Sequence, residues 1–241
     1  MLIGGIQTLT LLDFPGKVAT TVFTVGCNFR CGYCHNPELV LPELIKKNQH
    51  DLIPEEKFFN FLKSRCAPQG GGENFLDGVA ITGGEPTLQP DLVEFIAKIK
   101  AMGLLVKLDT NGTNPEMLKE LISRDLVDYY AMDIKYPLDI YDKITNTPFS
   151  AKIFTESIDL IRNSGADYEF RTTVIAEYHT PEIIEKIARI VSGCRRYTLQ
   201  NFRPDYTLDK KFAGFHSLTV EKLAELKKIA EKYIDEVKVI G

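Results

Sequence analysis

Three cysteines, Cys27, Cys31 and Cys34, lie within eight residues of one another in the segment 26–36. Three thiols at this spacing can converge on one metal centre, and soft thiolates select zinc or iron–sulfur clusters. Three ligands are one short of a closed site. A four-iron cluster held here would leave one iron open to a substrate or cofactor, so the spacing predicts a catalytic iron–sulfur cluster.

Two other interpretations of these cysteines remain open. Structural zinc needs a fourth ligand, and His35 is the nearest candidate, although a neighbour of Cys34 rarely turns its side chain to the same ion. Three unrelated core cysteines are the other alternative, because cysteine is often buried. The Gly, Asn and Arg residues around them are unusual for a core strand or helix. Cys66 and Cys194 lack such a context, and we interpret both as packing residues.

A glycine-rich motif follows an apolar run further along the chain. Gly83, Gly84 and Glu85 stand in the sequence Thr-Gly-Gly-Glu-Pro at 82–86. Glycines let backbone carbonyls approach a ligand closely, which favours a binding role. A strand-to-helix turn also favours glycine, so a structural role remains open.

Charged residues also occur in otherwise apolar runs. Asp109 and Thr110 precede an Asn-Gly dipeptide, which by itself is a common turn. Asp133 and Lys135 are two residues apart, so a strand places both on one face. Charged side chains that point inward must be paired with opposite charges or serve a binding function. An ordinary internal salt bridge between them remains the alternative.

Arg171 lies in a run of alternating apolar and polar residues, 168–173. We expect it to point inward toward a carboxylate, with Glu169 on the same face as the alternative partner. His179 and His216 have no motif context, and we expect both on the surface or in loops.

The elements that position these residues follow from hydrophobic periodicity. Short β-branched runs alternate with amphipathic segments, the pattern of parallel strands joined by helices. The predicted strands are 20–25, 78–82, 105–110, 129–134, 168–175 and 196–201. The predicted helices are 54–66, 91–102, 115–123, 151–164, 181–191 and 220–234. Segments 3–12 and 237–240 are further candidate strands.

The fold class predicted is α/β, an incomplete barrel of six βα units, because apolar parallel strands with right-handed crossovers form an open sheet or a barrel. We expect one domain. Residues 1–19 form an N-terminal extension, 20–204 the six-stranded core, and 205–241 a C-terminal helix and strand. Glycines 70–72 are interpreted as a flexible loop rather than a domain linker.

The cysteine motif, with the aromatic Tyr33 before its third cysteine, resembles the cluster motif of radical S-adenosylmethionine enzymes. The resemblance implies an incomplete (βα)6 barrel of the radical SAM type. It also implies a [4Fe-4S] cluster on Cys27, Cys31 and Cys34, whose open iron is chelated by S-adenosylmethionine. In that family one electron enters the sulfonium, giving methionine and a 5′-deoxyadenosyl radical that abstracts hydrogen.

The later motifs resemble those of glycyl-radical activating enzymes. In that family the matching residues meet the methionine amino group, the ribose and the methionine carboxylate, and nearby carboxylates take a monovalent cation. The resemblance implies cofactor contacts from Tyr33, His35, Gly83, Gly84, Glu85, Asp109, Thr110, Asp133, Lys135 and Arg171.

Within this family the resemblance is strongest to the activating proteins of anaerobic ribonucleoside-triphosphate reductase. It rests on the segments 12–16 and 33–36 and on a chain with little beyond the barrel. Residues 200–204 lack the histidine expected near the adenine in the pyruvate formate-lyase activase pattern. The implied partners are a glycyl-radical enzyme and a low-potential electron donor such as flavodoxin or ferredoxin.

Charge and hydropathy exclude several other classes. With 29 Lys and Arg against 33 Asp and Glu, the net charge of −4 has the wrong sign for binding the phosphates of a nucleic acid. There is no apolar run long enough for a membrane span and no credible secretory signal, so we expect a cytoplasmic protein without a membrane partner. Five cysteines, an odd number, do not suggest a disulfide framework.

Three hypotheses for function remain at this point. The first is an anaerobic oxidoreductase that installs a glycyl radical on a separate protein. The second is a radical enzyme acting on a small molecule. The third is a non-catalytic iron–sulfur electron carrier, which would need neither the glycine-rich motif nor the charged residues Asp109, Asp133 and Lys135.

Overall fold

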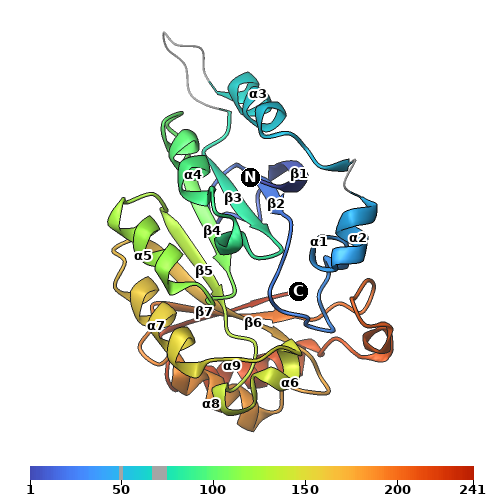
Figure 1. The fold of residues 1–241 in the computed structure, drawn as a ribbon. Coiled ribbons are helices and arrows are strands. Elements are labelled where there is room, and N and C mark those ends of the chain that lie inside the picture. The colour runs from blue at the N-terminus through green and yellow to red at the C-terminus, as the bar shows by residue number, and fades with distance from the viewer. Residues whose placement is uncertain (49–50, 67–74) are drawn as a thin grey trace. The chain divides into compact units, whose positions relative to one another are not determined.

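The computed structural model describes residues 1–48, 51–66 and 75–241 (Figure 1). The chain divides into two compact units. Unit 1 comprises Met1–Cys27, Glu38–Thr110 and Asn114–Tyr130, and unit 2 comprises Asn28–Pro37, Asn111–Thr113 and Ala131–Gly241. Glycines 70–72 lie outside the described residues, and the prediction of a single domain stays a prediction.

Unit 1 contains a row of strands in chain order. β1 (Ile3–Thr10) pairs antiparallel with β2 (Ala19–Thr24), and β2, β3 (Gly78–Gly83) and β4 (Leu105–Thr110) are parallel. Thr24 pairs in register with Gly83, so the segments that follow β2 and β3 leave the sheet at the same edge. This register places the residues next to Cys27 beside the glycine-rich motif.

Unit 2 contains β6 (Asp167–Val174), β7 (Arg196–Asn201) and β8 (Glu236–Ile240), which are also parallel. β5 (Tyr129–Asp133) crosses the boundary between the units. Just beyond its C-terminal end, the N–H of Ile134 donates to the C=O of Arg171, which ties this end to β6 in unit 2. The α/β class with parallel strands is confirmed.

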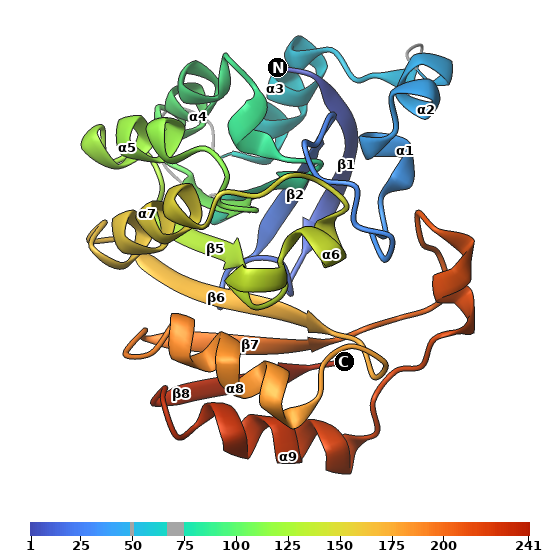
Figure 2. The ribbon, with the colours of Figure 1, turned by 60° about the horizontal axis from the view of Figure 1, so that its bottom comes forward.

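Helices connect the parallel strands as the periodicity predicts. In unit 1 they are α3 (Glu55–Arg65), α4 (Leu92–Lys100) and α5 (Pro115–Ser123), and in unit 2 α7 (Ala151–Arg162), α8 (Pro181–Ile190) and α9 (Val220–Ala230). Figure 2 shows α8 and α9 side by side along β7 and β8. Each helix presents buried apolar residues to its unit, such as Phe95 and Ile96 of α4 and Ile184 and Ile187 of α8.

Capping residues explain where several of these helices begin. Asn114 accepts from the N–H of Met117 at the start of α5, and Thr180 accepts from the N–H of Ile183 at the start of α8. Both helices also carry proline in the first turn, where its missing N–H costs nothing.

The predicted strands and helices agree with the structure to within a few residues at their ends. Pattern reasoning missed the short elements, because one turn of helix has too few residues to show a period. These are α1 (Pro37–Val40), α2 (Pro42–Lys47), α6 (Asp142–Thr145) and the 3₁₀ turns η2 (Pro86–Leu88), η3 (Leu138–Ile140) and η4 (Lys210–Gly214).

Candidate functional site

In unit 1 the glycine-rich turn after β3 packs against the backbone next to Cys27. The N–H of Gly84 donates to Thr24 C=O at 2.9 Å, and the N–H of Glu85 donates to Gly26 C=O at 2.7 Å. A Cβ on Gly84 would collide with the backbone of Gly26. Gly83 has φ of +113°, which other residues rarely adopt. Close approach of two backbones therefore requires both glycines.

The buried side chain of Glu85 organises the end of this turn. Its Oε1 accepts hydrogen bonds from Thr87 N–H at 3.1 Å, from Thr87 Oγ1 at 2.6 Å and from Thr110 Oγ1 at 2.8 Å. The structure thus brings together Glu85 and Thr110, two residues that the sequence assigns to the cofactor pocket. The contact links the ends of β3 and β4.

Asp109, also at the end of β4, forms an ion pair with Lys107. Lys107 is nearly completely buried, which a lysine tolerates only when its charge is compensated. The sequence analysis did not single out Lys107. Alternation along β4 could have revealed it, because residues two apart on a strand share a face.

In unit 2 the second and third cysteines lie in the cysteine loop, residues 28–36, which has no helix or strand within it. Cys31 is buried and Cys34 is half-buried, and the N–H of Cys34 donates to Cys31 C=O in a tight turn. Cys27, which ends the first segment of unit 1, is also half-buried.

Three thiols within eight residues of one another fit an iron–sulfur cluster as a donor set, with one iron left without a protein ligand. Within the described ranges, no three His, Cys, Asp or Glu side chains are gathered closely enough to form a ready metal site. The assignment of these cysteines as ligands therefore stays a prediction.

Tyr33 and His35 of the cysteine loop contact the C-terminal part of unit 2. Burial raises the pKa of Tyr33 well above its ordinary value, and its ring lies 6.2 Å from that of Phe212. His35 Nδ1 lies 2.9 Å from the carbonyl oxygen of Tyr206, so this nitrogen carries the proton and donates it. The structure places both rings in packing contacts within unit 2.

Asp133, Lys135 and Arg171 form a charged cluster at the ends of β5 and β6. Lys135 Nζ lies 3.0 Å from Asp133 Oδ2, and Arg171 Nε donates to Asp133 Oδ1 at 3.0 Å. Burial opposes ionisation of Asp133, but the two cations outweigh it and lower its pKa to about 2. Asp133 and Lys135 form the ion pair that the sequence left open as an alternative, and Arg171 points toward a carboxylate as expected. Glu169 accepts a hydrogen bond from Thr198.

His179 lies in a loop, as expected, but it is buried rather than exposed. Its Nδ1 accepts the N–H of Ile175 at 3.0 Å, and its Nε2 lies 3.1 Å from the carbonyl oxygen of Lys135. These partners require a neutral ring with the proton on Nε2, and burial lowers the pKa of His179 to about 4. Nothing in the sequence around His179 predicts this contact with the charged cluster. His216 is exposed, as expected.

Residues 200–204, which lack the histidine of the pyruvate formate-lyase activase pattern, begin at the end of β7. Asn201, the last residue of β7, hydrogen-bonds the backbone of Leu218 in both directions, from its Nδ2 and to its Oδ1. Its side chain is therefore used to hold the chain that leads into α9. Of the remaining cysteines, Cys194 is buried, consistent with packing, and burial raises its pKa to about 11. Cys66 is half-buried.

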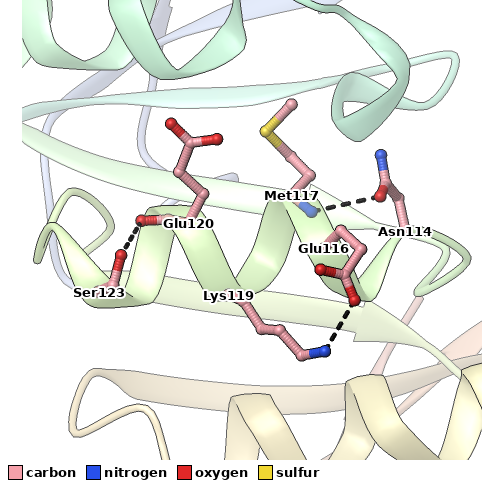
Figure 3. A pocket seen from close by; sticks show the side chains of 6 residues that line it. All are labelled: Asn114, Glu116, Met117, Lys119, Glu120 and Ser123. Atoms are coloured by element: carbon pink, nitrogen blue, oxygen red, sulfur yellow. Dashed lines mark hydrogen bonds and ion pairs between the residues drawn. The ribbon is translucent and has the colours of Figure 1, made fainter.

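A surface hollow in unit 1 contains none of the predicted site residues (Figure 3). Its lining comes from α5 and the residue that caps it: Asn114, Glu116, Met117, Lys119, Glu120 and Ser123. Glu116 and Lys119 pair with each other at 2.7 Å on the helix surface. A hollow formed along one helix cannot enclose a ligand, so the strand ends remain the candidate site.

Comparison with known proteins agrees with the geometry. Residues 21–191 match the Radical SAM superfamily. The protein MJ1227 of Methanocaldococcus jannaschii, named among the glycyl-radical enzyme activating enzymes, is 37% identical over 98% of this chain and 94% of its own length. The pyruvate formate-lyase-activating enzyme of Clostridium pasteurianum is 28% identical over 98% of this chain and 97% of its own.

Solved structures share the fold at low sequence identity. A domain of the pyruvate-formate lyase-activating enzyme of Bacteroides vulgatus matches with a TM-score of 0.56 and 17% identity, over 68% of this chain and 99% of that one. SuiB of Streptococcus suis, bound to its precursor peptide SuiA, matches with a TM-score of 0.66 and 13% identity, over 90% of this chain and 47% of that one. Among the described residues, none of the helices has the length and apolar character needed to cross a membrane.

Proposed function

The chain belongs to the radical SAM superfamily and, within it, to the glycyl-radical enzyme activating enzymes, and from this membership we propose that it installs a glycyl radical on a separate protein. It is therefore an enzyme, and the cofactors of its family are a [4Fe-4S] cluster and S-adenosylmethionine. The electron carrier hypothesis does not account for this membership.

The observation that carries the proposal is the contact between the glycine-rich turn and the residue before Cys27. Glu85 N–H donates to Gly26 C=O, and Gly84 approaches the same backbone too closely for any side chain. Cys27 thus follows directly after Gly26, whose backbone contacts the glycine-rich turn. This turn is the motif expected to meet the methionine amino group. A protein that only carried electrons would not need this contact between the glycine-rich turn and the residue before Cys27.

The residues would divide the work as follows. Cys27, Cys31 and Cys34 would hold the cluster. The backbone at Gly83 and Gly84 would receive the methionine amino group, since glycine leaves its carbonyls accessible. The bound cofactors would supply one-electron cleavage of S-adenosylmethionine, whose 5′-deoxyadenosyl part would take a hydrogen atom from the partner's glycine.

The charged cluster of unit 2 would orient the cofactor. Lys135 is cationic and suits the methionine carboxylate, while Asp133 stays ionised and can accept hydrogen bonds from the ribose hydroxyls. Arg171 keeps the carboxylate of Asp133 in place through its ion pair. Asp109 in unit 1 and Asp133 in unit 2 each remain a proposed carboxylate ligand for a monovalent cation. Roles for Tyr33, His35, Glu85 and Thr110 in the cofactor pocket also remain proposals.

The reaction balances as one electron, one S-adenosylmethionine and one glycine C–H giving methionine, 5′-deoxyadenosine and a glycyl radical. The electron would come from a low-potential donor such as flavodoxin or ferredoxin, in the cytoplasm. We take anaerobic ribonucleoside-triphosphate reductase as the partner, because residues 200–204 lack the histidine of the pyruvate formate-lyase activase pattern. Activation of pyruvate formate-lyase is the second candidate, favoured by the relative from Clostridium pasteurianum.

The test is to mix the reduced, reconstituted protein and S-adenosylmethionine with each partner and record the organic radical by electron paramagnetic resonance. We expect a stable glycyl radical on the anaerobic reductase and a weaker or absent signal on pyruvate formate-lyase. A partner whose radical glycine is replaced by alanine is the matched control. A radical on pyruvate formate-lyase alone would favour the second candidate. Robust cleavage without any glycyl radical, with a small metabolite consumed, would favour the small-molecule enzyme.

A further inference from the structure

We propose that the 206–215 segment, which follows β7, is a positioning element for the cysteine loop, with Phe212 as its anchor. It would hold the backbone around Cys31 and Cys34 in place before any iron is bound. The inference rests on the proposed function, because it takes these cysteines as cluster ligands.

Backbone contacts join the 206–215 segment to the second half of the cysteine loop. The N–H of Leu208 donates to Cys34 C=O at 3.0 Å, and the N–H of Asp209 donates to Gly32 C=O at 2.8 Å. The side chain of His35 adds a third link, to the carbonyl of Tyr206. A loop without helix or strand must find partners for its carbonyl groups elsewhere, and here the 206–215 segment provides them.

The ring of Phe212 anchors this contact. It is 3% exposed, and its centroid lies 6.2 Å from that of Tyr33, 5.9 Å from Tyr178, 6.3 Å from Phe202 and 4.7 Å from Phe215. Tyr33 belongs to the cysteine loop, whereas the other rings come from the loop after β6, the residue that follows β7 and the 206–215 segment itself. Aromatic pairs at these separations add to the gain from burial.

Gly32, between Cys31 and Tyr33, lies directly against this ring. A Cβ on Gly32 would collide with Cε2 of Phe212. Gly32 does not have a positive φ, so other residues can adopt its backbone conformation. Glycine is required here by the space that Phe212 occupies, which makes the contact testable by substitution.

The first half of the cysteine loop has separate supports. The N–H of Arg30 donates to Thr145 C=O at 2.8 Å, and Asn146 Nδ2 donates to Arg30 C=O at 3.0 Å. Asn111 Nδ2 donates to Asn28 Oδ1 at 2.8 Å. Loss of the Phe212 contact would therefore release the part that carries Cys34 while the start of the loop stays anchored.

The test uses Gly32→Ala, Phe212→Leu and the double variant, with Gly214→Ala as the matched control. Gly214 lies in the same segment, and a Cβ there has open space around it. Three quantities are measured: the rate of Cys34 alkylation in the metal-free protein, the iron and sulfide bound after anaerobic reconstitution, and the melting temperature. The first readout does not depend on the activity of the loaded enzyme.

We expect Gly32→Ala to raise the rate of Cys34 alkylation about tenfold through local opening and to lower the iron bound to below about half, with little change in melting temperature. Phe212→Leu alone should also raise the alkylation rate, and Gly32→Ala should add little in that background, because leucine lacks the ring atoms that meet the new methyl group. A general loss of stability would not make the effect of Gly32→Ala depend on Phe212. Gly214→Ala should behave as wild type.

Wild-type alkylation and iron content in Gly32→Ala, or an equally large effect of Gly32→Ala in the Phe212→Leu background, would overturn the proposal. If Gly32→Ala does not fold, Phe212→Leu alone decides: a faster Cys34 alkylation supports the proposal and an unchanged rate contradicts it. Cys31→Ala distinguishes a failure of the proposed function from a failure of the positioning role. If Cys31→Ala keeps the cluster, the ligand assignment of the proposed function fails. If it loses the cluster while Gly32→Ala loads fully, only the positioning role fails.

Discussion

Oγ1 of Thr110 lies 2.8 Å from Oε1 of Glu85, and this hydrogen bond joins the end of β4 to the end of β3. Both side chains are buried. The same carboxylate oxygen also accepts two hydrogen bonds from Thr87, which fixes the turn that follows the two glycines. Any influence of the Thr110 hydroxyl on a ligand at this turn therefore passes at least partly through Glu85.

Thr110→Val should lower the free energy of unfolding by about 1–2 kcal/mol, because it leaves a buried acceptor one donor short. Thr110→Ser keeps the hydroxyl and is the matched control, with a smaller loss. Urea unfolding of the metal-free protein measures both. Equal stability of Thr110→Val and wild type would show that the hydrogen bond contributes nothing.

Cys27, Cys31 and Cys34 should each be necessary for a stable cluster. Replacing any one by alanine leaves an iron without its thiolate, so iron and sulfide bound after anaerobic reconstitution should fall to near zero. Cys66→Ala and Cys194→Ala are the controls and should load normally. Loss of the cluster in Cys66→Ala with retention in Cys31→Ala would refute the ligand assignment.

Asp133→Asn should destabilise the protein by about 3 kcal/mol, because Lys135 and Arg171 would keep their charges in a largely buried place without the carboxylate. It should also weaken binding of S-adenosylmethionine while the iron content stays unchanged. Chemical denaturation and the effect of S-adenosylmethionine on the reduced cluster's paramagnetic spectrum measure the two effects. Asp139→Asn is the control, because Asp139 is exposed and its ion pair with Lys186, at 3.8 Å, is too long and too solvated to contribute much. Unchanged cofactor binding in Asp133→Asn would argue for a purely structural pair.

The stability of unit 2 should depend on pH through His179. Its pKa of about 4 in the folded protein lies below the ordinary 6.5, so between these values the unfolded chain binds a proton that the folded protein does not. The contribution of the neutral ring is complete above pH 6.5 and is lost as the pH falls toward 4, by roughly 3 kcal/mol in total. Unfolding free energies at a series of pH values, compared between wild type and His179→Gln, check this. The variant should lose less stability on acidification, and parallel curves would contradict the expectation.

The sequence was sufficient for the parts of this protein that depend on local pattern. The strands that carry Asp109 and Asp133 lie where alternation and β-branched runs predict them, because the side-chain period is set within each strand. The cysteine motif identified the chemistry for the same reason, since ligand type and spacing are local properties. The period of two predicted Asp133 and Lys135 on one face, and the two side chains form an ion pair although β5 ends at Asp133.

Partners that come from distant parts of the chain required the tertiary structure. Arg171 could have paired with Glu169 on its own strand, and only the placement of β6 beside the end of β5 decided for Asp133. Lys107 and His179 carry no motif, so their burial became visible only when the surrounding elements were in place. The contact of Phe212 with Gly32 joins residues far apart in the sequence, and no periodicity connects them. Local pattern determines which face a residue occupies, whereas strand order and loop packing determine what it meets there.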